Sequence, residues 1–233
     1  MTLKLVALSA GLSVPSSTRL LADRLTESVR AALASHAAGA GDATVGPDIE
    51  VRVIELRELA VPIANHLVTG FPPPALDEAI EAVTEADALI AVTPVFAAAY
   101  SGLFKSFFDL LDPDALTGKP VLIGATGGTA RHSLVLEHAL RPLFSYLRAV
   151  VIPTAVYAAS EDWGGTGDPL TDTLPTRIER AGVQLAALLT AEAGRAGGRA
   201  SSAGSVSGLA GMLAAADGVA GAQGSVMADL RLG

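Results

Sequence analysis

Hydroxyl side chains gather between the first apolar segment of the chain and the first helix-like segment. The stretch from residue 9 to residue 19 reads Ser-Ala-Gly-Leu-Ser-Val-Pro-Ser-Ser-Thr-Arg and contains five hydroxyls. A helix N-terminus offers free backbone N–H groups and the positive end of the helix dipole, which suit a phosphate group. The stretch begins at Ser9; Ser16, Ser17 and Thr18 are candidate hydroxyl donors to a phosphate, and Arg19 is a candidate charge. N-capping by the Ser/Thr cluster is the alternative, and the stretch matches neither a P-loop nor a G-x-G-x-x-G turn.

A second stretch, Thr93–Gly102, is small and apolar and contains two aromatic residues. Such a segment can line a flat ring system, with backbone groups meeting the polar edge of the ring. The stretch includes Pro94, Val95, Phe96 and Tyr100. The alternative is a buried loop that packs on the following helix, in which case Tyr100 belongs to the core.

A third stretch, Ala125–Ser133, contains a pair of glycines. Paired glycines permit close approach of the backbone to a ligand. The stretch includes Thr126, Gly127, Gly128 and Thr129. The alternative is a strand-to-helix turn that needs a positive φ.

Several other chemistries are excluded or disfavoured. The chain has no cysteine, which removes thiolate nucleophiles, disulfides and iron–sulfur clusters and fits a reducing cytoplasm. There is no G-x-S-x-G elbow, and the four histidines show no metal-ligand spacing with carboxylates. The formal net charge of -8 argues against a nucleic-acid partner, because phosphate backbones are held by clustered Lys and Arg.

No membrane segment is expected either. The first apolar run, at Leu5–Leu8, is short and reads as a buried strand better than as a signal peptide. The longest later run, Ala88–Ala99, is interrupted by Pro94 and falls short of the roughly 20 residues that a spanning helix needs.

Alternating strand-like and helix-like segments must position the three stretches. The predicted strands are Leu3–Leu8, Glu50–Glu55, Ala88–Thr93, Pro120–Ala125 and Val150–Val156. The predicted helices are Thr18–Ser35, Ala75–Ala86, Gly102–Leu111, Ser133–Leu147 and one from about Pro175 to Ala193. This alternation predicts a doubly wound α/β fold with right-handed crossovers. Each stretch follows a strand, and ligands of open parallel sheets bind at the carboxyl ends of the strands.

The remaining segments are predicted to be connections or a tail. Ala37–Pro47 is read as a surface loop, and Pro62–Pro74, with its four prolines and Gly70, as irregular. Residues 1–194 form the predicted domain. Residues 195–233 form a Gly/Ala/Ser-rich tail of linker composition, with one short helix expected at Leu209–Ala216. The tail is either disordered or docks on a partner subunit.

These residues resemble those of the flavodoxin-like NAD(P)H-dependent FMN reductases. The most specific match is Thr93–Lys105 followed by Phe108–Leu111. The second is Ala125–Thr129 with His132 and the later Ala139–Pro142. The likeness is strongest to reductases of two-component sulfonate monooxygenases and covers about residues 3–193. Ser160–Trp163 resembles a branch linked with luciferase-like monooxygenases.

The resemblance implies a five-stranded parallel sheet, bound FMN and a homodimer or homotetramer. The Ser9–Thr18 loop would hold the phosphate, Pro94 to Phe96 would border the isoalloxazine, and Thr126 to Thr129 would close its other side. The family often has Tyr where Phe96 stands, so a hydroxyl contact is lost. His138 falls where some relatives carry an extra residue that bulges a helix.

The function implied is hydride transfer from NAD(P)H to N5 of FMN, with delivery of reduced FMN to a monooxygenase. The flavin performs the chemistry, so no catalytic side chain is expected. Backbone N–H groups near Gly128 and Thr129, with help from Arg131, would stabilise negative charge on the reduced flavin. The alternatives are an NAD(P)H:quinone or azo-dye reductase, a non-enzymatic FMN electron carrier, and a phosphate- or nucleotide-binding module without redox activity.

Overall fold

The protein is built on a parallel sheet. The computed structural model describes residues 2–39, 48–164 and 172–192. The strands β2 (Ile49–Glu55), β1 (Leu3–Ser9), β3 (Ala88–Phe96) and β5 (Pro120–Gly127) lie side by side in that order. All neighbours among them are parallel. The near-continuous apolar character of β1, β3 and β5 is explained by their burial on both faces.

The fifth position of the sheet is divided between two short strands. β6 (Val150–Val151) pairs with the start of β5, and β7 (Val156–Ala159) pairs with its end. The predicted single strand at Val150–Val156 is therefore wrong in extent, and Pro153 lies in the interruption, where it cannot donate to a ladder. A further strand, β4 (Ala99–Tyr100), pairs antiparallel with β3. The sheet thus has seven strands but the five parallel positions that were predicted, which confirms the doubly wound fold.

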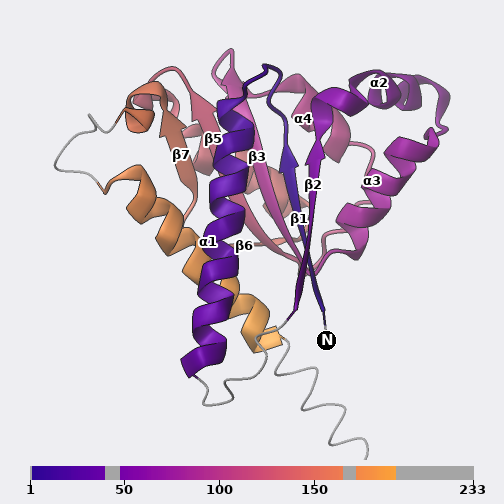
Figure 1. The fold of residues 1–233 in the computed structure, drawn as a ribbon. Helices are drawn as coiled ribbons and strands as arrows, with labels where there is room; N and C mark the ends of the chain where they lie inside the picture. Colours follow the sequence, from indigo (N-terminus) through magenta and orange to yellow (C-terminus); the bar gives the residue numbers. More distant parts are fainter. Residues whose placement is uncertain (1, 40–47, 165–171, 193–233) are drawn as a thin grey trace, which may run out of the picture. The chain divides into compact units, whose positions relative to one another are not determined.

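Helices connect these strands across both faces of the sheet (Figure 1). The α-helices are α1 (Ser17–Gly39), α2 (Ala60–Thr69), α3 (Pro74–Glu85), α4 (Gly102–Phe108), α5 (Arg141–Tyr146) and a last helix at residues 174–192. The short 3-10 helices are η1 (Leu56–Leu59), η2 (Ala130–His132) and η4 (Ser160–Trp163), and η3 (Leu136–Leu140) is a π-helix. His138 lies within η3, so the bulge implied at that position is present. None of the described helices is long and apolar enough to cross a membrane.

The prediction that Pro62–Pro74 is irregular is wrong. Most of this segment belongs to α2 and the start of α3, separated by a short connection. Pro62 lies in the first turn of α2, where a missing N–H breaks no helical hydrogen bond. Gly70 ends α2 with φ +75°, and Pro74 is the first residue of α3, the position at which proline is favoured.

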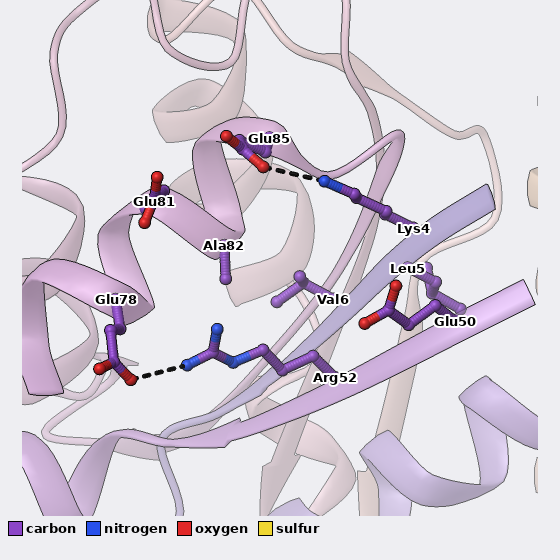
Figure 2. A pocket seen from close by; sticks show the side chains of 9 residues that line it. All are labelled: Lys4, Leu5, Val6, Glu50, Arg52, Glu78, Glu81, Ala82 and Glu85. Carbon is purple, nitrogen blue, oxygen red and sulfur yellow. Dashed lines mark hydrogen bonds and ion pairs between the residues drawn. The ribbon is translucent and has the colours of Figure 1, made fainter. Parts of the chain in front are cut away.

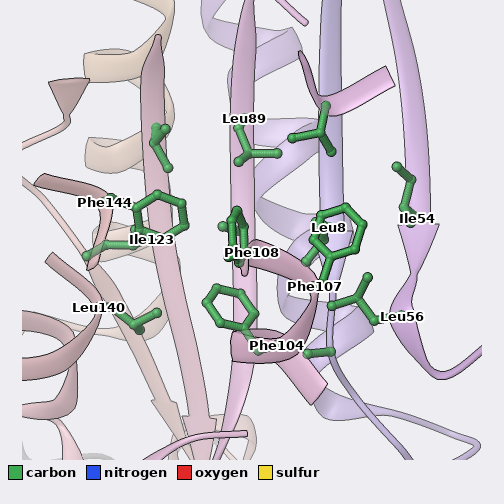
Figure 3. Close-up of a cluster of buried hydrophobic side chains, with 14 of the residues drawn as sticks. Leu8, Ile54, Leu56, Leu89, Phe104, Phe107, Phe108, Ile123, Leu140 and Phe144 are labelled. Carbon is green, nitrogen blue, oxygen red and sulfur yellow. The ribbon is translucent and has the colours of Figure 1, made fainter. Parts of the chain in front are cut away.

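Two apolar cores lie on opposite faces of the sheet. One face is covered by α3, α4, η3 and α5, and its centre is formed by Phe104, Phe107, Phe108 and Phe144 (Figure 3). The ring of Phe108 lies 4.7 Å from that of Phe104 and 4.9 Å from that of Phe144, measured between centroids. These tilted and edge-on contacts hold α4 firmly beneath the loop that precedes it.

The other face is covered by α1 and the helix at residues 174–192. Gly182 allows their close approach, because a Cβ there would lie 2.2 Å from the Ser28 Oγ and 2.8 Å from the Ser28 backbone. The Ser28 hydroxyl donates to the Ile178 carbonyl at 3.1 Å. The predicted Gly/Ala/Ser-rich tail, its domain boundary at residues 194–195 and its short helix lie outside the described residues.

Candidate functional site

The first loop turns tightly between β1 and α1. Ser9 is buried at the end of β1, and its Oγ accepts a hydrogen bond from the Gly11 N–H at 3.4 Å. A Cβ on Gly11 would lie 2.0 Å from the Ser16 Oγ, so only glycine fits where the loop folds back. The Ser16 Oγ accepts from the Arg19 N–H at 3.2 Å, which makes Ser16 the helix cap. The capping alternative is therefore correct for Ser16.

Capping leaves donors in the first turn of α1. The backbone N–H groups of Ser17 and Thr18 have no acceptor within the helix, as is general for a helix start. Ser17 is exposed, whereas Thr18 is buried. The loop therefore offers hydroxyls and N–H groups as neutral donors for an anion.

A hydrogen bond between threonine hydroxyls joins the first loop to the third. The Oγ1 atoms of Thr18 and Thr126 lie 2.8 Å apart, and both residues are buried. Thr126 in turn lies opposite Pro94 in the β3–β5 register. The three predicted loops therefore meet at one edge of the sheet, the edge formed by the carboxyl ends of β1, β3 and β5.

The second loop is a hairpin between β3 and β4. Val95 pairs with Tyr100 and Phe96 with Ala99, so Ala97 and Ala98 form a two-residue turn. Their φ values are 47° and 66°, the sign that a type I′ hairpin requires and that alanine disfavours. Phe96 is 49% exposed, so the hairpin presents an aromatic face to solvent.

Tyr100 has a different environment. Its side chain is half-buried against the core, and its ring lies 6.0 Å from that of Phe104. The alternative that Tyr100 belongs to the core is therefore correct for the part of the ring that packs near Phe104. Ser101 donates its N–H to the Thr93 Oγ1 at 3.1 Å, which fixes the base of the hairpin.

The third loop combines one crowded glycine with one open glycine. A Cβ on Gly127 would lie 2.1 Å from the Tyr157 Oη, whereas a Cβ on Gly128 would meet no protein atom within 4 Å. Neither glycine has a positive φ, so the alternative of a turn needing positive φ is wrong. Gly127 is required by packing. The space beside Gly128 is open to a ligand.

Tyr157 is a residue of this edge that the sequence analysis missed. Its hydroxyl donates to the Thr129 carbonyl at 2.9 Å, which pins the third loop to β7. Burial raises the pKa of Tyr157, and the nearby Asp162 carboxylate raises it further. The phenol thus stays a donor throughout the physiological range. Tyr157 directly follows the predicted last strand, Val150–Val156, and this place at the carboxyl end of a predicted strand is the sequence signal that could have found it.

The acidic turn after β7 supports Tyr157. Asp162 accepts from the Ala159 N–H at 2.8 Å and from Arg177 at 2.6 Å. Arg177 also donates to the Tyr157 carbonyl. Asp162 is therefore a structural carboxylate that ties η4 to the helix at residues 174–192.

Arg19, the candidate phosphate charge, is engaged by carboxylates. Its Nε donates to Asp23 at 2.8 Å, and its NH1 donates to Glu55 at 2.6 Å. The pKa of Arg19 is raised, chiefly by the hydrogen bond with Asp23. Arg131 and His132 are exposed on η2, next to Thr129.

A separate hollow of about 220 Å³ lies between α3 and the amino-terminal halves of β1 and β2 (Figure 2). Glu85 pairs with Lys4 at 2.9 Å and Glu78 with Arg52 at 3.8 Å. Glu50 and Glu81 also line it, so carboxylates outnumber cations. A hollow with this charge is a poor site for a phosphate-bearing ligand, which favours the loop-lined edge.

The loop-lined edge fits a flavin mononucleotide. Neutral donors at the start of α1 suit its phosphate, and the exposed Phe96 and the open space at Gly128 suit a flat ring. The strand order, with its switch between β1 and β3, is that of flavodoxin-like proteins, whose ligands bind at this switch. Fold and site together define a flavodoxin-like nucleotide-binding protein.

Comparison with known families makes the assignment more specific. Residues 3–164 match the family model described as NADPH-dependent FMN reductase, and the chain belongs to this family. Membership confirms the predicted resemblance, the enzyme class and the use of FMN and NAD(P)H. The protein is an NAD(P)H-dependent oxidoreductase that acts on FMN.

Individual relatives agree with the family. The chain is 40% identical over 182 residues to the NADH-dependent FMN reductase SfnF of Pseudomonas fluorescens, covering 77% of this chain and 90% of the relative. It is 47% identical to a solved oxidoreductase of Corynebacterium diphtheriae, with a TM-score of 0.73 over 81% of this chain and 97% of that one. A WrbA-like flavodoxin of Agrobacterium tumefaciens, 16% identical, shares the fold with a TM-score of 0.50 over 81% of this chain and 97% of that one.

Proposed function

We propose that the protein reduces FMN at the loop-lined edge and releases it as a substrate for a partner flavin-dependent monooxygenase. The observation that carries the location is the meeting of the three loops, joined by the 2.8 Å hydrogen bond between Thr18 and Thr126. When bound, FMN supplies the acceptor for a hydride from NAD(P)H. The family and the SfnF relative support the reaction.

The proposed roles of the residues follow from their chemistry. Ser9 shapes the phosphate loop, and Ser16, Ser17 and Thr18 with their backbone N–H groups bind the phosphate. Pro94, Val95 and Phe96 border one side of the ring, with Tyr100 supporting them from the core. Thr126, Gly127, Gly128 and Thr129 border the other side.

The chain positions the reactants and requires no acid or base of its own. The nicotinamide ring would stack on the open flavin face beside Gly128, so that proximity is the main catalytic contribution. Backbone N–H groups of Gly128 and Thr129 would stabilise negative charge on reduced FMN. Tyr157 keeps these groups in place through the Thr129 carbonyl.

We also propose that the protein works as a homodimer or homotetramer in the cytoplasm. Val61, Leu67, Val68 and Phe71 are exposed apolar side chains on and after α2, with Val68 86% and Phe71 80% exposed. A surface of this kind is typical of an interface. The absence of cysteine supports a reducing compartment.

The test of the function is NAD(P)H oxidation by the purified protein, followed by absorbance with and without added FMN. We expect oxidation that depends on FMN and saturates with it, under both NADH and NADPH. Oxidation that requires a quinone or an azo dye instead would refute the proposal. Tight binding of FMN without any NAD(P)H oxidation would identify the protein as an electron carrier.

A further inference from the structure

One carboxylate at the end of β2 holds two arginines that flank the phosphate loop. The Glu55 Oε1 accepts from the Arg19 NH1 at 2.6 Å, and its Oε2 lies 3.0 Å from the Arg57 NH2. The Glu55 side chain is 15% exposed, less than either arginine. The two ion pairs are thus partly sheltered from solvent, where charge interactions are stronger than at the surface.

Both arginines lie beside the loop. Arg19 belongs to the first turn of α1, and Arg57 donates from its NH1 to the Ser13 carbonyl at 3.2 Å. Guanidinium groups are the strongest phosphate binders among side chains, since they offer charge and paired donors together. Two arginines at this place would ordinarily produce tight binding of a phosphate dianion.

Carboxylates cancel that charge. Besides Glu55, Arg19 contacts Asp23 at 2.8 Å and Arg57 lies 3.9 Å from Glu58. Three carboxylates therefore surround two guanidinium groups. The loop itself contributes only hydroxyls and N–H groups, which bind a phosphate without net charge.

We propose that Glu55 limits the affinity of the site for the phosphate of FMN by neutralising Arg19 and Arg57. This inference rests on the proposed function, because a limited affinity allows reduced FMN to leave for a partner enzyme. Glu55 is on this basis an affinity-setting residue: it acts through the two arginines and touches neither the flavin ring nor the nicotinamide.

The experiment is Glu55→Gln, with dissociation constants for FMN and for riboflavin measured by flavin fluorescence quenching. Glutamine keeps the size of the side chain and an acceptor oxygen but removes the charge. We expect the Kd for FMN to fall about fivefold at low ionic strength and the gain to shrink in salt. The Kd for riboflavin, which lacks the phosphate, should not change.

Glu58→Gln is the matched control. It removes the same charge near the same arginine, but the Glu58 side chain is 70% exposed, so solvent screens it and the Kd for FMN should change less than about twofold. An equal fall in the Kd for FMN in both variants would mean that only the net charge of the protein matters, and it would overturn the inference.

Unchanged or weaker FMN binding by Glu55→Gln would also overturn it. Weaker binding of both flavins would show that Glu55 only supports the loop. Failure of the proposed function has a different signature, because it is read on the unsubstituted protein, which would then show no FMN-dependent NAD(P)H oxidation whether or not it binds flavin.

Discussion

Gly127 and Tyr157 should behave as an energetically coupled pair. In Gly127→Ala the new Cβ would lie 2.1 Å from the Tyr157 Oη, a distance that forces the buried ring to move. The movement breaks the hydrogen bond to the Thr129 carbonyl. Overpacking of this kind costs about 1–3 kcal/mol, and the lost hydrogen bond adds about 1 kcal/mol. We expect Gly127→Ala to lower the free energy of unfolding by about 2–4 kcal/mol.

The double variant should recover most of this loss. Tyr157→Phe alone removes one hydrogen bond and should cost about 1 kcal/mol. In its background the nearest atom to a Cβ on Gly127 becomes Cζ, at 3.2 Å, a tight contact that a small shift relieves. Gly127→Ala should then lower the free energy of unfolding by less than about 1 kcal/mol more, so the coupling energy of the cycle is at least about 1–3 kcal/mol.

Urea unfolding of the four proteins without flavin measures the cycle. A parallel thermal scan should show Gly127→Ala melting lower by about 2–4 °C per kcal/mol lost. Additive losses in the double variant would refute the reasoning, because they would mean that the hydroxyl is not what crowds position 127. A Gly127→Ala variant with the same free energy of unfolding as the unsubstituted protein would refute the reasoning more directly.

Three further predictions concern the hairpin, the π-helix and the aromatic face. Ala98→Gly should stabilise the protein by about 0.5 kcal/mol, since glycine accepts the positive φ, whereas Ala99→Gly in the adjacent strand should destabilise it in the same urea assay. The hydrogen bond from Arg141 lowers the pKa of Glu137. The pair therefore contributes to the free energy of unfolding at neutral pH, and this contribution is lost as pH falls through that lowered pKa. Because the pair is largely exposed, Glu137→Gln should lower the free energy of unfolding by about 0.3–0.5 kcal/mol at neutral pH and should leave it unchanged in acid. A difference between the variant and the unsubstituted protein that stays constant across pH would contradict this assignment. Phe96→Ala should weaken FMN binding about tenfold in a fluorescence titration and change stability by less than about 0.5 kcal/mol; unchanged affinity would remove Phe96 from the site.

The sequence was sufficient to predict the convergence of the three loops. Each loop follows a short, nearly continuous apolar segment, which is typical of an interior parallel strand, and parallel strands bring their carboxyl ends to one edge. The site then follows from connectivity alone. The resemblance added the ligand, and the position of the π-helix at His138, to what this geometry implied.

Contacts between distant residues were beyond prediction. The Tyr157–Thr129 hydrogen bond spans 28 residues and the Arg19–Glu55 pair spans 36, and no local pattern links their partners. The helix α2 was missed for another reason. Proline was read as a breaker, although in the first turn of a helix it costs no hydrogen bond.

The pairing of the first and last described helices has a consequence during synthesis. Ser28 of α1 contacts Ile178, 150 residues later in the chain. At a ribosomal rate of about 5–20 residues per second, this interval lasts roughly 8–30 s. Throughout it, the part of the apolar core that the helix at residues 174–192 covers has no final cover. All three ligand loops precede Ile178 in the chain, so the parts of the site are synthesised before the last helix can close the fold. Apolar surface that is exposed for such an interval is prone to aggregate.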